Sequence, residues 1–341
     1  MTSADLTPVP DSGGTIGSAP AHSVTFTQLR YFVEAASRLS MTEASLHLHV
    51  AQSAVSSAVA ALERQLGAQL FIRKHSKGLV LTPAGRDFLR DARSVLDHLG
   101  EVLTAAQGDR DTVRGTVRLA MMVTLMPFVL PSLLTDLRGR YPDLDVVVTE
   151  SEPSGVGAAL CDGSVDLAIG YDLLLSEDID HEVVADAPPY VLLPPTHRLA
   201  RQPRVSLRDL ANEPMVLLDL PGSRDYFIRL LRDSGIQPDV RYRTTNYEAV
   251  RALVARGHGF AILNQVSAGS VTYDGGRAVA RPIADEVPAL PVVLSWLNTG
   301  RLTGRIRTVA ERAREVVPAS IRAIRADAAA DERRADTEPI P

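Results

Sequence analysis

Amide and hydroxyl side chains gather on one side of a helix predicted between His49 and Gly67. Its apolar residues recur at spacings of four, three and four, which places them on one helical face: Val55, Val59, Leu62 and Leu66. The opposite face carries Gln52, Ser53, Ser56 and Ser57. Glutamine can bind adenine through two hydrogen bonds, and short serines let a helix approach base edges in a groove about 12 Å wide. A helix facing only water would favour Lys or Glu, because Ser is a poor helix former.

The segments around this helix predict a small DNA-binding domain over residues 25–82. A first helix begins with a capping-box pattern, Thr25 and Gln28, and a short second helix follows with Thr42 as its expected N-cap. After the third helix, apolar and polar residues alternate around Ser76-Lys77-Gly78, as in a two-stranded hairpin. Three helices and a hairpin are typical of a winged helix-turn-helix, whose third helix enters the major groove of DNA.

Positive charge is concentrated on the predicted hairpin, although the chain has a net charge of -5. Arg73, Lys74 and Lys77 lie there, and they include both lysines of the chain. Such a patch favours salt-dependent contacts with DNA phosphates. Three positive charges can also meet by chance on any surface loop.

A long helix is predicted after the hairpin, over residues 83–109. Thr82 and Pro83 form a helix-start signature, a hydroxyl N-cap followed by proline at the first helical position. Apolar residues then recur with the 3.5-residue period of a coiled coil: Phe88, Ala92, Val95, Leu99 and Val102. We expect this face to pair two chains, which predicts a homo-oligomer on a pseudo-palindromic DNA site. The alternative is that the helix packs on its own winged domain.

Strands and helices alternate from residue 115 to 320, and two stretches, 140–169 and 234–263, share one order of elements. Two similar α/β lobes predict a two-lobed domain of the periplasmic-binding-protein type, with a ligand at the carboxyl ends of its strands. We expect lobe 1 at about 115–172 and 277–320, and lobe 2 at about 173–276. The polar ends, 1–24 and 326–341, are predicted to be disordered.

Composition and missing motifs exclude several classes of protein. The single cysteine, Cys161, cannot form an internal disulfide, and neither a secretory signal nor a membrane span is visible, so a cytoplasmic protein is expected. No hydrolase, zinc-protease, P-loop or dinucleotide motif occurs, which argues against an enzyme, a cofactor and a metal site. A solute-binding protein would lack the N-terminal helices. A DNA-binding regulator whose C-terminal half only oligomerises, without an effector, remains the alternative.

The run from Leu29 to Gly85, with "VAQSAVSSAVAALERQLGAQLFIRK" at its centre, resembles the LysR-type transcriptional regulators. The resemblance extends over about Phe26–Val317 and implies DNA binding as dimers of dimers, contact with RNA polymerase, and a small-molecule effector of unknown identity between two lobes. It implies groove contacts by Gln52, Ser53 and Ser56 and a phosphate contact by Arg73. The family commonly has serine and proline where this chain has Ala51 and Ser53, so base readout is expected to lean more on DNA shape and the wing.

The resemblance, together with two predicted helix starts, also gives candidate effector contacts. They are Met122, Thr124, Ser154, Ser223, Arg224, Asn246 and Phe260. Met122 stands where the family often has a serine, and Thr124 precedes a helix start whose backbone N–H groups favour an anion. Methionines beside few polar groups suggest an effector with an apolar body and an acidic or polar end. Alternatively, the methionines are ordinary core and only Thr124 and Ser223 face the ligand.

Overall fold

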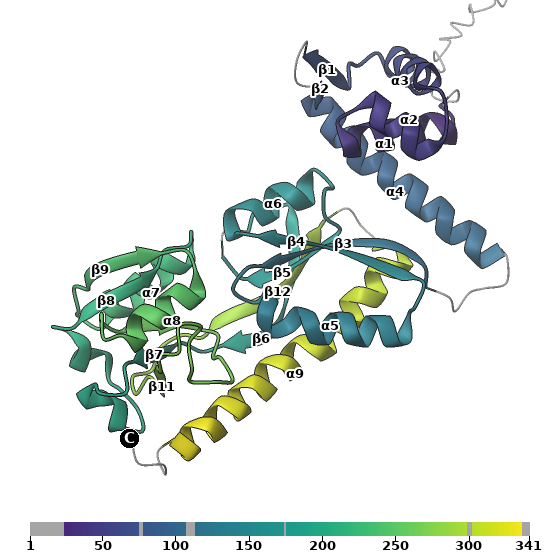
Figure 1. Cartoon of the computed structure of the whole chain (residues 1–341). Helices are drawn as coiled ribbons and strands as arrows, with labels where there is room; N and C mark the ends of the chain where they lie inside the picture. Colours follow the sequence, from purple (N-terminus) through teal and green to yellow (C-terminus); the bar gives the residue numbers. More distant parts are fainter. Residues whose placement is uncertain (1–23, 75–77, 107–112, 174, 299–301, 336–341) are drawn as a thin grey trace, which may run out of the picture. The chain divides into compact units, whose positions relative to one another are not determined.

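The computed structural model describes residues 24–74, 78–106, 113–173, 175–298 and 302–335. The chain divides into two compact units, residues 1–96 and 97–341, and each is described by itself (Figure 1). Residues 1–23 of the segment predicted to be disordered at the N-terminus, and Lys77 on the wing, lie outside the described part, whereas Val24 packs against the core of the first unit. Within the described residues, no helix combines the length and apolar character needed to cross a bilayer.

The first unit is the predicted winged helix-turn-helix. Its elements follow in chain order: α1 Phe26–Arg38, α2 Met41–Leu48, α3 Gln52–Leu66, β1 Phe71–Lys74, β2 Gly78–Leu81 and α4 Pro83–Ala106. The capping box of Thr25 and Gln28 is confirmed, and so is the Thr82 cap of α4, whose hydroxyl accepts from the Gly85 N–H at 2.9 Å. The predicted Thr42 cap is wrong, because Ser40 accepts from the Glu43 N–H and α2 therefore begins at Met41.

Phe32 of α1 lies at the centre of the first unit's core, with no exposed surface. Its ring lies 5.4 Å from that of Phe71 and 5.2 Å from that of Phe88, so it joins α1 to the hairpin and to α4. Burying one such side chain stabilises the fold by about 1.5–3 kcal/mol. At Gly85 a Cβ atom would lie 2.1 Å from the carbonyl oxygen of Leu70, so the start of α4 approaches the hairpin too closely for any side chain.

The predicted pairing face of α4 is divided in two. Phe88 and Ala92 pack into the core of their own winged domain, so for these two residues the expectation of contact with a second chain is corrected. Further along the helix, Val95 and Val102 are exposed over 47% and 51% of their surface, while Leu99 is half-buried. Only the part of the face from Val95 onward remains for a partner chain.

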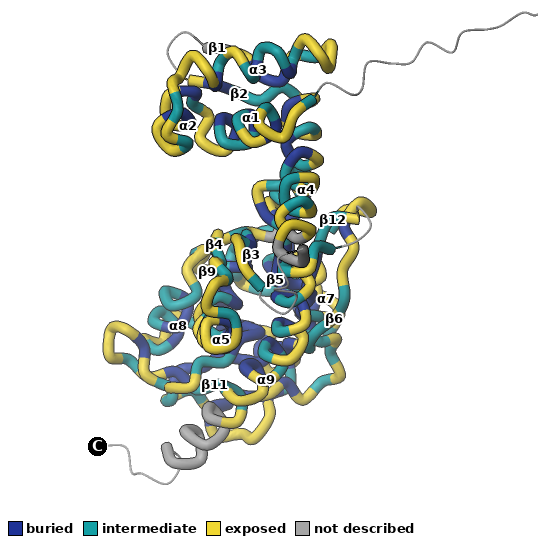
Figure 2. Tube along the Cα trace, turned by 90° about the vertical axis from the view of Figure 1, so that its right-hand side faces the viewer, coloured by how far each residue is buried: buried dark blue, intermediate teal, exposed yellow. Residues whose placement is uncertain are grey.

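In the second unit, lobe 1 is built on a five-stranded sheet of order β4-β3-β5-β12-β6. The strands are β3 Gly115–Met122, β4 Leu144–Ser151, β5 Leu167–Tyr171, β6 Ile179–Ala187 and β12 Leu290–Leu297. Helices α5 (Met126–Arg140) and α9 (Gly304–Ala335) share one hydrophobic core on the sheet, and α6 (Pro153–Cys161) packs into a second. The central strand β5 is buried along its whole length, whereas the edge strand β4 has no fully buried residue (Figure 2).

Lobe 2 holds the sheet β10-β7-β11 and the parallel pair β8-β9. Its elements are β7 Tyr190–Leu193, β8 Pro214–Leu218, α7 Ser223–Asp233, β9 Asp239–Thr244, α8 Tyr247–Ala255, β10 Ala261–Leu263 and β11 Val279–Pro282. Phe260 bridges to Met215, which brings β8 beside β10. Buried residues of β7, β10, β8, α7 and α8 form one continuous core, and Ala280 of β11 packs against it.

Both predicted lobe boundaries are corrected by strand pairing. β6 lies beyond residue 172 and yet pairs antiparallel with β12 in the sheet of lobe 1. β11 lies beyond residue 277 and yet pairs with β7 in lobe 2. Lobe 1 therefore comprises residues up to 187 and from 290 onward, and lobe 2 comprises residues 188–289. Hydrogen-bonding partners decide these boundaries, and the order of elements along the chain does not reveal them.

The C-terminal helix is longer than the sequence predicts. α9 runs through Pro318 to Ala335, so the stretch expected to be disordered from residue 326 begins as helix. Arg325 explains part of this extension, because its Nη2 donates to the carbonyl oxygens of Pro188 and Asn264, each at 2.7 Å. Pro188 lies where the chain first passes from lobe 1 into lobe 2. Arg325 therefore links α9 to that crossover.

Candidate nucleic-acid interface and ligand cavity

The polar side chains of α3 lie on its surface, as predicted from their spacing. Gln52, Ser53 and Ser57 are exposed and Ser56 is half-buried, and we call these four residues the α3 polar face. The Gln52 Nε2 donates to Ser56 Oγ at 3.0 Å, so two members of the face are linked one helical turn apart. The opposite side of the helix, Val55, Val59 and Leu62, is at most 1% exposed. The core therefore fixes which side of α3 is offered outward.

The start of α3 lacks a side-chain cap. Ala51 occupies the N-cap position in an extended conformation and makes no side-chain hydrogen bond. A Ser, Thr, Asp or Asn there would add about 0.5–2 kcal/mol of stability. Gly67 ends the helix in a left-handed conformation, with φ of 63°. The polar face thus begins at Gln52, the first residue of a helix that has no side-chain cap.

The hairpin that follows α3 is tied to the helices at both strands. The Glu63 carboxylate of α3 accepts from the Leu70 and Phe71 N–H groups at 2.8 and 3.1 Å. On the other strand, the Leu79 N–H donates to the Leu39 carbonyl oxygen at 3.0 Å. Arg73 and Lys74, two of the three predicted phosphate contacts, are residues of β1 opposite Leu79 and Gly78. The backbone that carries these cations is therefore held in place relative to α3.

Gly78 is required at the start of β2 for two reasons. Its φ of +75° lies in the left-handed region, and a Cβ atom would lie only 3.0 Å from the Leu39 carbonyl oxygen. Glycine therefore allows the wing to approach the turn between α1 and α2.

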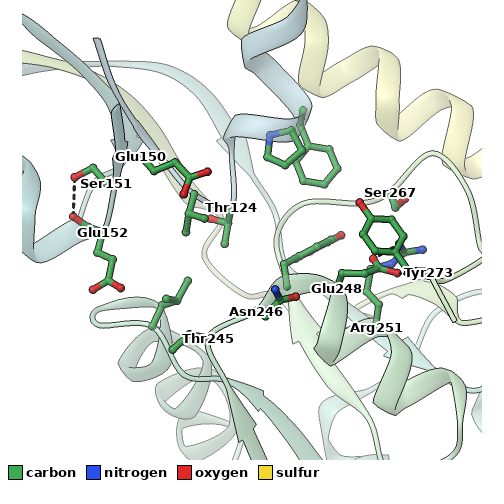
Figure 3. A pocket seen from close by; sticks show the side chains of 15 residues that line it. Thr124, Glu150, Ser151, Glu152, Thr245, Asn246, Glu248, Arg251, Ser267 and Tyr273 are labelled. Carbon is green, nitrogen blue, oxygen red and sulfur yellow. Dashed lines mark hydrogen bonds and ion pairs between the residues drawn. The ribbon is translucent and has the colours of Figure 1, made fainter. Parts of the chain in front are cut away.

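In the second unit, parallel strands of both lobes end at a common cavity. β3 and β4 end in register at Met122 and Ser151, and β8 and β9 end in register at Leu218 and Thr244. Residues just after these ends line a cavity of about 660 Å³ (Figure 3). Its polar wall in lobe 1 consists of Thr124, Glu150, Ser151 and Glu152, and in lobe 2 it includes Asn246, Glu248, Arg251 and Tyr273. The volume lies within the usual range for small-molecule sites, about 300–1,000 Å³.

Thr124 and Asn246 are the predicted effector contacts that line this cavity. Thr124 also lines a small adjoining pocket together with Ser223, which is 3% exposed at the start of α7. The Asn246 Oδ1 already accepts from the Ala249 N–H at 2.9 Å, so it caps α8 and keeps only its amide N–H₂ for a ligand. The structure brings these three residues to one region of the interlobe space.

The other predicted effector contacts lie elsewhere. Met122 and Phe260 are 1% and 2% exposed and belong to the two lobe cores, so placing them in the cleft was wrong. Ser154 is exposed on α6, and Arg224 forms ion pairs with Asp219 and Asp225, both at 3.2 Å. Neither is among the residues lining the cavity. Met122 is the last residue of β3, whose final four residues are all buried, so neither side of the strand end faces the cavity.

A buried ion pair holds the lobe 2 wall of the cavity. Arg251 Nη1 lies 2.7 Å from Glu248 Oε2, with the two side chains 6% and 14% exposed. Arg251 Nη2 donates to the carbonyl oxygens of Gly269 and Val271, and the other Glu248 oxygen accepts from the Tyr273 N–H at 2.8 Å. The sequence analysis missed this pair, although its i, i+3 spacing on a helix is a signal that could have found it.

Tyrosine hydroxyls connect the two lobes beneath the cavity. Tyr190 and Tyr247 both donate to the Gln265 carbonyl oxygen, at 2.7 and 2.6 Å, and Gln265 Nε2 donates to the hydroxyl of Tyr171 in lobe 1 at 3.1 Å. Burial raises the pKa of Tyr247 to about 12 and raises that of Tyr190 as well, so both stay protonated donors at neutral pH. The three tyrosines and Gln265 thus form a network of neutral hydrogen-bonding groups between the lobes.

Cys161 is half-buried at the end of α6 and does not line the cavity. Across the described part of the chain, no group of three or more His, Cys, Asp or Glu side chains could hold a metal ion.

Comparison with known proteins matches both units. The profile of the LysR substrate binding domain matches residues 110–318, and that of the bacterial regulatory helix-turn-helix protein of the lysR family matches residues 26–86. The crystal structure of HinK, a LysR family transcriptional regulator from Pseudomonas aeruginosa, is 34% identical, with a TM-score of 0.59 over 87% of this chain and 100% of that one. A full-length OxyR variant from the same organism is 25% identical, with a TM-score of 0.68 over 88% and 98%.

Curated relatives give the same result from sequence. The HTH-type transcriptional regulator YnfL of Escherichia coli is 30% identical over 79% of this chain and 90% of its own length. A probable hydrogen peroxide-inducible genes activator of Mycobacterium leprae is 29% identical over 88% and 96%.

Proposed function

The chain belongs to the LysR family of transcriptional regulators, which bind DNA under the control of a small-molecule effector, and from that premise we propose how its residues divide the work. The α3 polar face reads base edges in the major groove, while Arg73, Lys74 and Lys77 of the wing contact phosphates on either side. Gln52 is the principal base contact, because an amide can form two hydrogen bonds with adenine. The cationic hairpin supplies affinity that does not depend on sequence.

One observation supports the assignment of α3: Gln52, Ser53 and Ser57 are exposed, while Val55, Val59 and Leu62 on the opposite side are buried and only Leu66, at the helix end, is exposed. If the helix were an ordinary core helix, these side chains would be packed inside the unit. The 3.0 Å hydrogen bond from Gln52 to Ser56 supports the proposal further, because it orients the amide along the exposed side. A pre-oriented amide loses less side-chain entropy when it binds a base edge.

The chain acts as a homo-oligomer in this proposal. The α4 side chains Val95 and Val102, exposed on the isolated chain, pair with a second copy, so that two α3 helices meet two half-sites of a pseudo-palindrome. Contact of the DNA-bound oligomer with RNA polymerase follows from the family as a further expectation. The ligand cavity between the lobes receives the effector.

Effector binding is coupled to DNA binding through the lobes. A ligand in the cavity touches residues of both lobes, so it favours whichever lobe arrangement gives it more contacts. The arrangement also depends on the Tyr171–Gln265 hydrogen bond and on the Phe128–Tyr247 ring contact at 5.7 Å, which both cross between lobes. A shift in lobe position changes the pairing of chains and hence the spacing of the recognition helices.

Selection of binding sites from a random pool of duplex DNA tests the proposal. We expect the full chain to enrich an inverted repeat with half-sites about one helical turn apart. A Gln52→Ala variant should still bind and lose the preference at one base pair of each half-site. Gln237→Ala, an exposed glutamine of lobe 2, is the matched control and should leave the selected sequence unchanged. Failure to enrich any sequence at low salt would contradict the proposal.

A further inference from the structure

We propose that the effector carries a positively charged amine, held in the interlobe cavity by Glu150 and Glu152. This inference rests on the proposed function, because it names the chemical class of the molecule that the cavity receives. The resemblance alone suggested an effector with an acidic or polar end, whereas the charges that line the cavity favour a positively charged end.

The only guanidinium on the cavity wall, as far as the described residues go, is that of Arg251, and both of its terminal nitrogens donate to acceptors of the protein. It pairs with Glu248 at 2.7 Å and donates to the carbonyl oxygens of Gly269 and Val271. At 6% side-chain exposure it cannot turn toward a ligand without leaving those acceptors unpaired. A carboxylate effector therefore finds no available cation there, and the Glu248–Arg251 pair is neutral as a unit.

Glu150 and Glu152 remain as uncompensated charges on the lobe 1 wall. Both are exposed, and no hydrogen bond or ion pair to either carboxylate occurs within the described part of the chain. They lie two residues apart at the end of β4, a spacing that directs both to the same side. In Figure 3 both side chains extend from the end of that strand into the open space of the cavity. Two like charges on one wall create a negative potential that attracts cations.

A buried hydroxyl provides an independent indication of a ligand. Thr124 is 6% exposed, and its Oγ1 is buried without a hydrogen-bond partner among the described residues. Thr124 lines the same cavity as the two glutamates. An unmade hydrogen bond of a buried polar atom costs about 1–3 kcal/mol, which a ligand N–H would recover.

The cavity wall also includes neutral side chains that can accept hydrogen bonds. Besides the two carboxylates and Thr124, the hydroxyl-bearing residues Thr245 and Ser267 line it. An ammonium group has three donors and no acceptor, so it complements such a wall. The apolar part of the wall includes the rings of Phe128, Tyr247 and Tyr273, and aromatic faces bind cations and flat apolar bodies alike.

Two helix starts at the cavity could favour an anion, but both are already compensated. In α5, the N–H groups of Phe128 and Val129 donate to the Leu125 carbonyl oxygen, and Pro127 has no N–H. In α8, Asn246 caps the first turn and Glu248 lies in it as an acidic residue. The positive ends of these helices therefore leave the excess negative charge of Glu150 and Glu152 in place.

Matched triplets of small molecules test the inference on the full-length protein. Each triplet shares one body, phenyl, indolyl, imidazolyl or butyl, and differs only in ending as an ethylamine, a propanoate or an ethanol. Thermal unfolding and titration calorimetry at millimolar ligand should show stabilisation by the amine of at least one triplet and not by its acid or alcohol. Glu150→Gln and Glu152→Gln should each weaken that amine about tenfold, as expected for loss of a charge-assisted hydrogen bond.

Asp145→Asn is the matched control, because it removes the same charge from the other end of the same strand. It should leave amine affinity unchanged, and an equal loss in this variant would overturn the site assignment. Preferential binding of the propanoates, or no binding by any amine, would overturn the amine proposal. Different results would contradict the proposed function itself: a random-pool selection that yields no DNA site, or DNA binding that no compound of any charge alters.

Discussion

The α3 polar face and the interlobe cavity are both sets of polar side chains offered to a ligand, and they are built in opposite ways. The face consists of residues within one turn and a half of a single helix, from Gln52 to Ser57. The cavity draws its wall from positions between Val123 and Tyr273, brought together by two pairs of parallel strands. A surface for DNA can therefore be specified locally, whereas a pocket between lobes depends on residues that never touch the ligand.

The largest predicted effect concerns the framework of the cavity. Arg251→Met leaves the Glu248 carboxylate buried without its partner, which costs about 3–5 kcal/mol. Denaturant unfolding should show this loss for the second unit, while selection from duplex DNA still identifies the same half-site. Arg256→Met, just beyond the end of α8, breaks the exposed ion pair with Asp274 and should leave the stability nearly unchanged. Equal losses of stability in the two variants would contradict the view that the Glu248–Arg251 pair supports the cavity framework while the Arg256–Asp274 pair is only a surface contact.

A smaller effect is expected where the DNA-binding unit does depend on close packing. Gly85→Ala places a Cβ atom 2.1 Å from the Leu70 carbonyl oxygen, so the start of α4 must move, at a cost of about 1–3 kcal/mol. Gly100→Ala on the same helix meets nothing within 4 Å and should instead stabilise by up to about 1 kcal/mol. Thermal unfolding of both variants checks the contrast, and a stable Gly85→Ala protein would contradict the packing.

The next effect separates the two parts of the DNA interface. Gln52→Ala should lose about 1–3 kcal/mol at one base pair per half-site and bind all other positions as before. Arg73→Ala should weaken every sequence alike and lower the slope of affinity against salt by about one. Binding titrations on cognate and altered duplexes at several salt concentrations distinguish them. The same sequence-independent loss in both variants would refute the division of roles.

The smallest effect is a pH dependence in the loop that carries Tyr273 at the cavity rim. Hydrogen bonds from Thr272 and Arg256 lower the pKa of Asp274 to about 2, below its ordinary value of 3.8. Because the folded pKa is the lower one, the stabilisation is complete above about pH 4 and disappears as the pH falls toward 2. The thermal midpoints of the protein and of Asp274→Asn should therefore converge over that range.

An exposed carboxylate of lobe 2 without such hydrogen bonds serves as the reference for this pH dependence. Asp233→Asn is the control variant, and its thermal unfolding is measured over the same pH range. If the difference in thermal midpoint from the parent chain changed with pH equally in both variants, Asp274 would have no special role in the loop.

Periodicity predicted the helices of the first unit closely, because each helix needs only an apolar face and local caps. The capping box at Thr25 and the exposed α3 polar face both follow from residues within a few positions of one another. The α4 face was predicted less well, since spacing cannot tell whether Phe88 meets a second chain or its own core. The same limit applies to Met122, since spacing does not show that both sides of the end of β3 are buried.

Sequence by itself therefore determined the fold class, the family and the outward side of the recognition helix, since these depend on short-range spacing and on local charge. Tertiary structure alone decided the lobe boundaries, through the pairing of β6 with β12 and of β11 with β7. It also decided the charge of the cavity, because Arg251 is neutralised by contacts that only folding creates, whereas Glu150 and Glu152 have no ion-pair partner among the described residues. The charged residues can be read from the sequence, but which of them pair depends on distances that exist only in the folded chain.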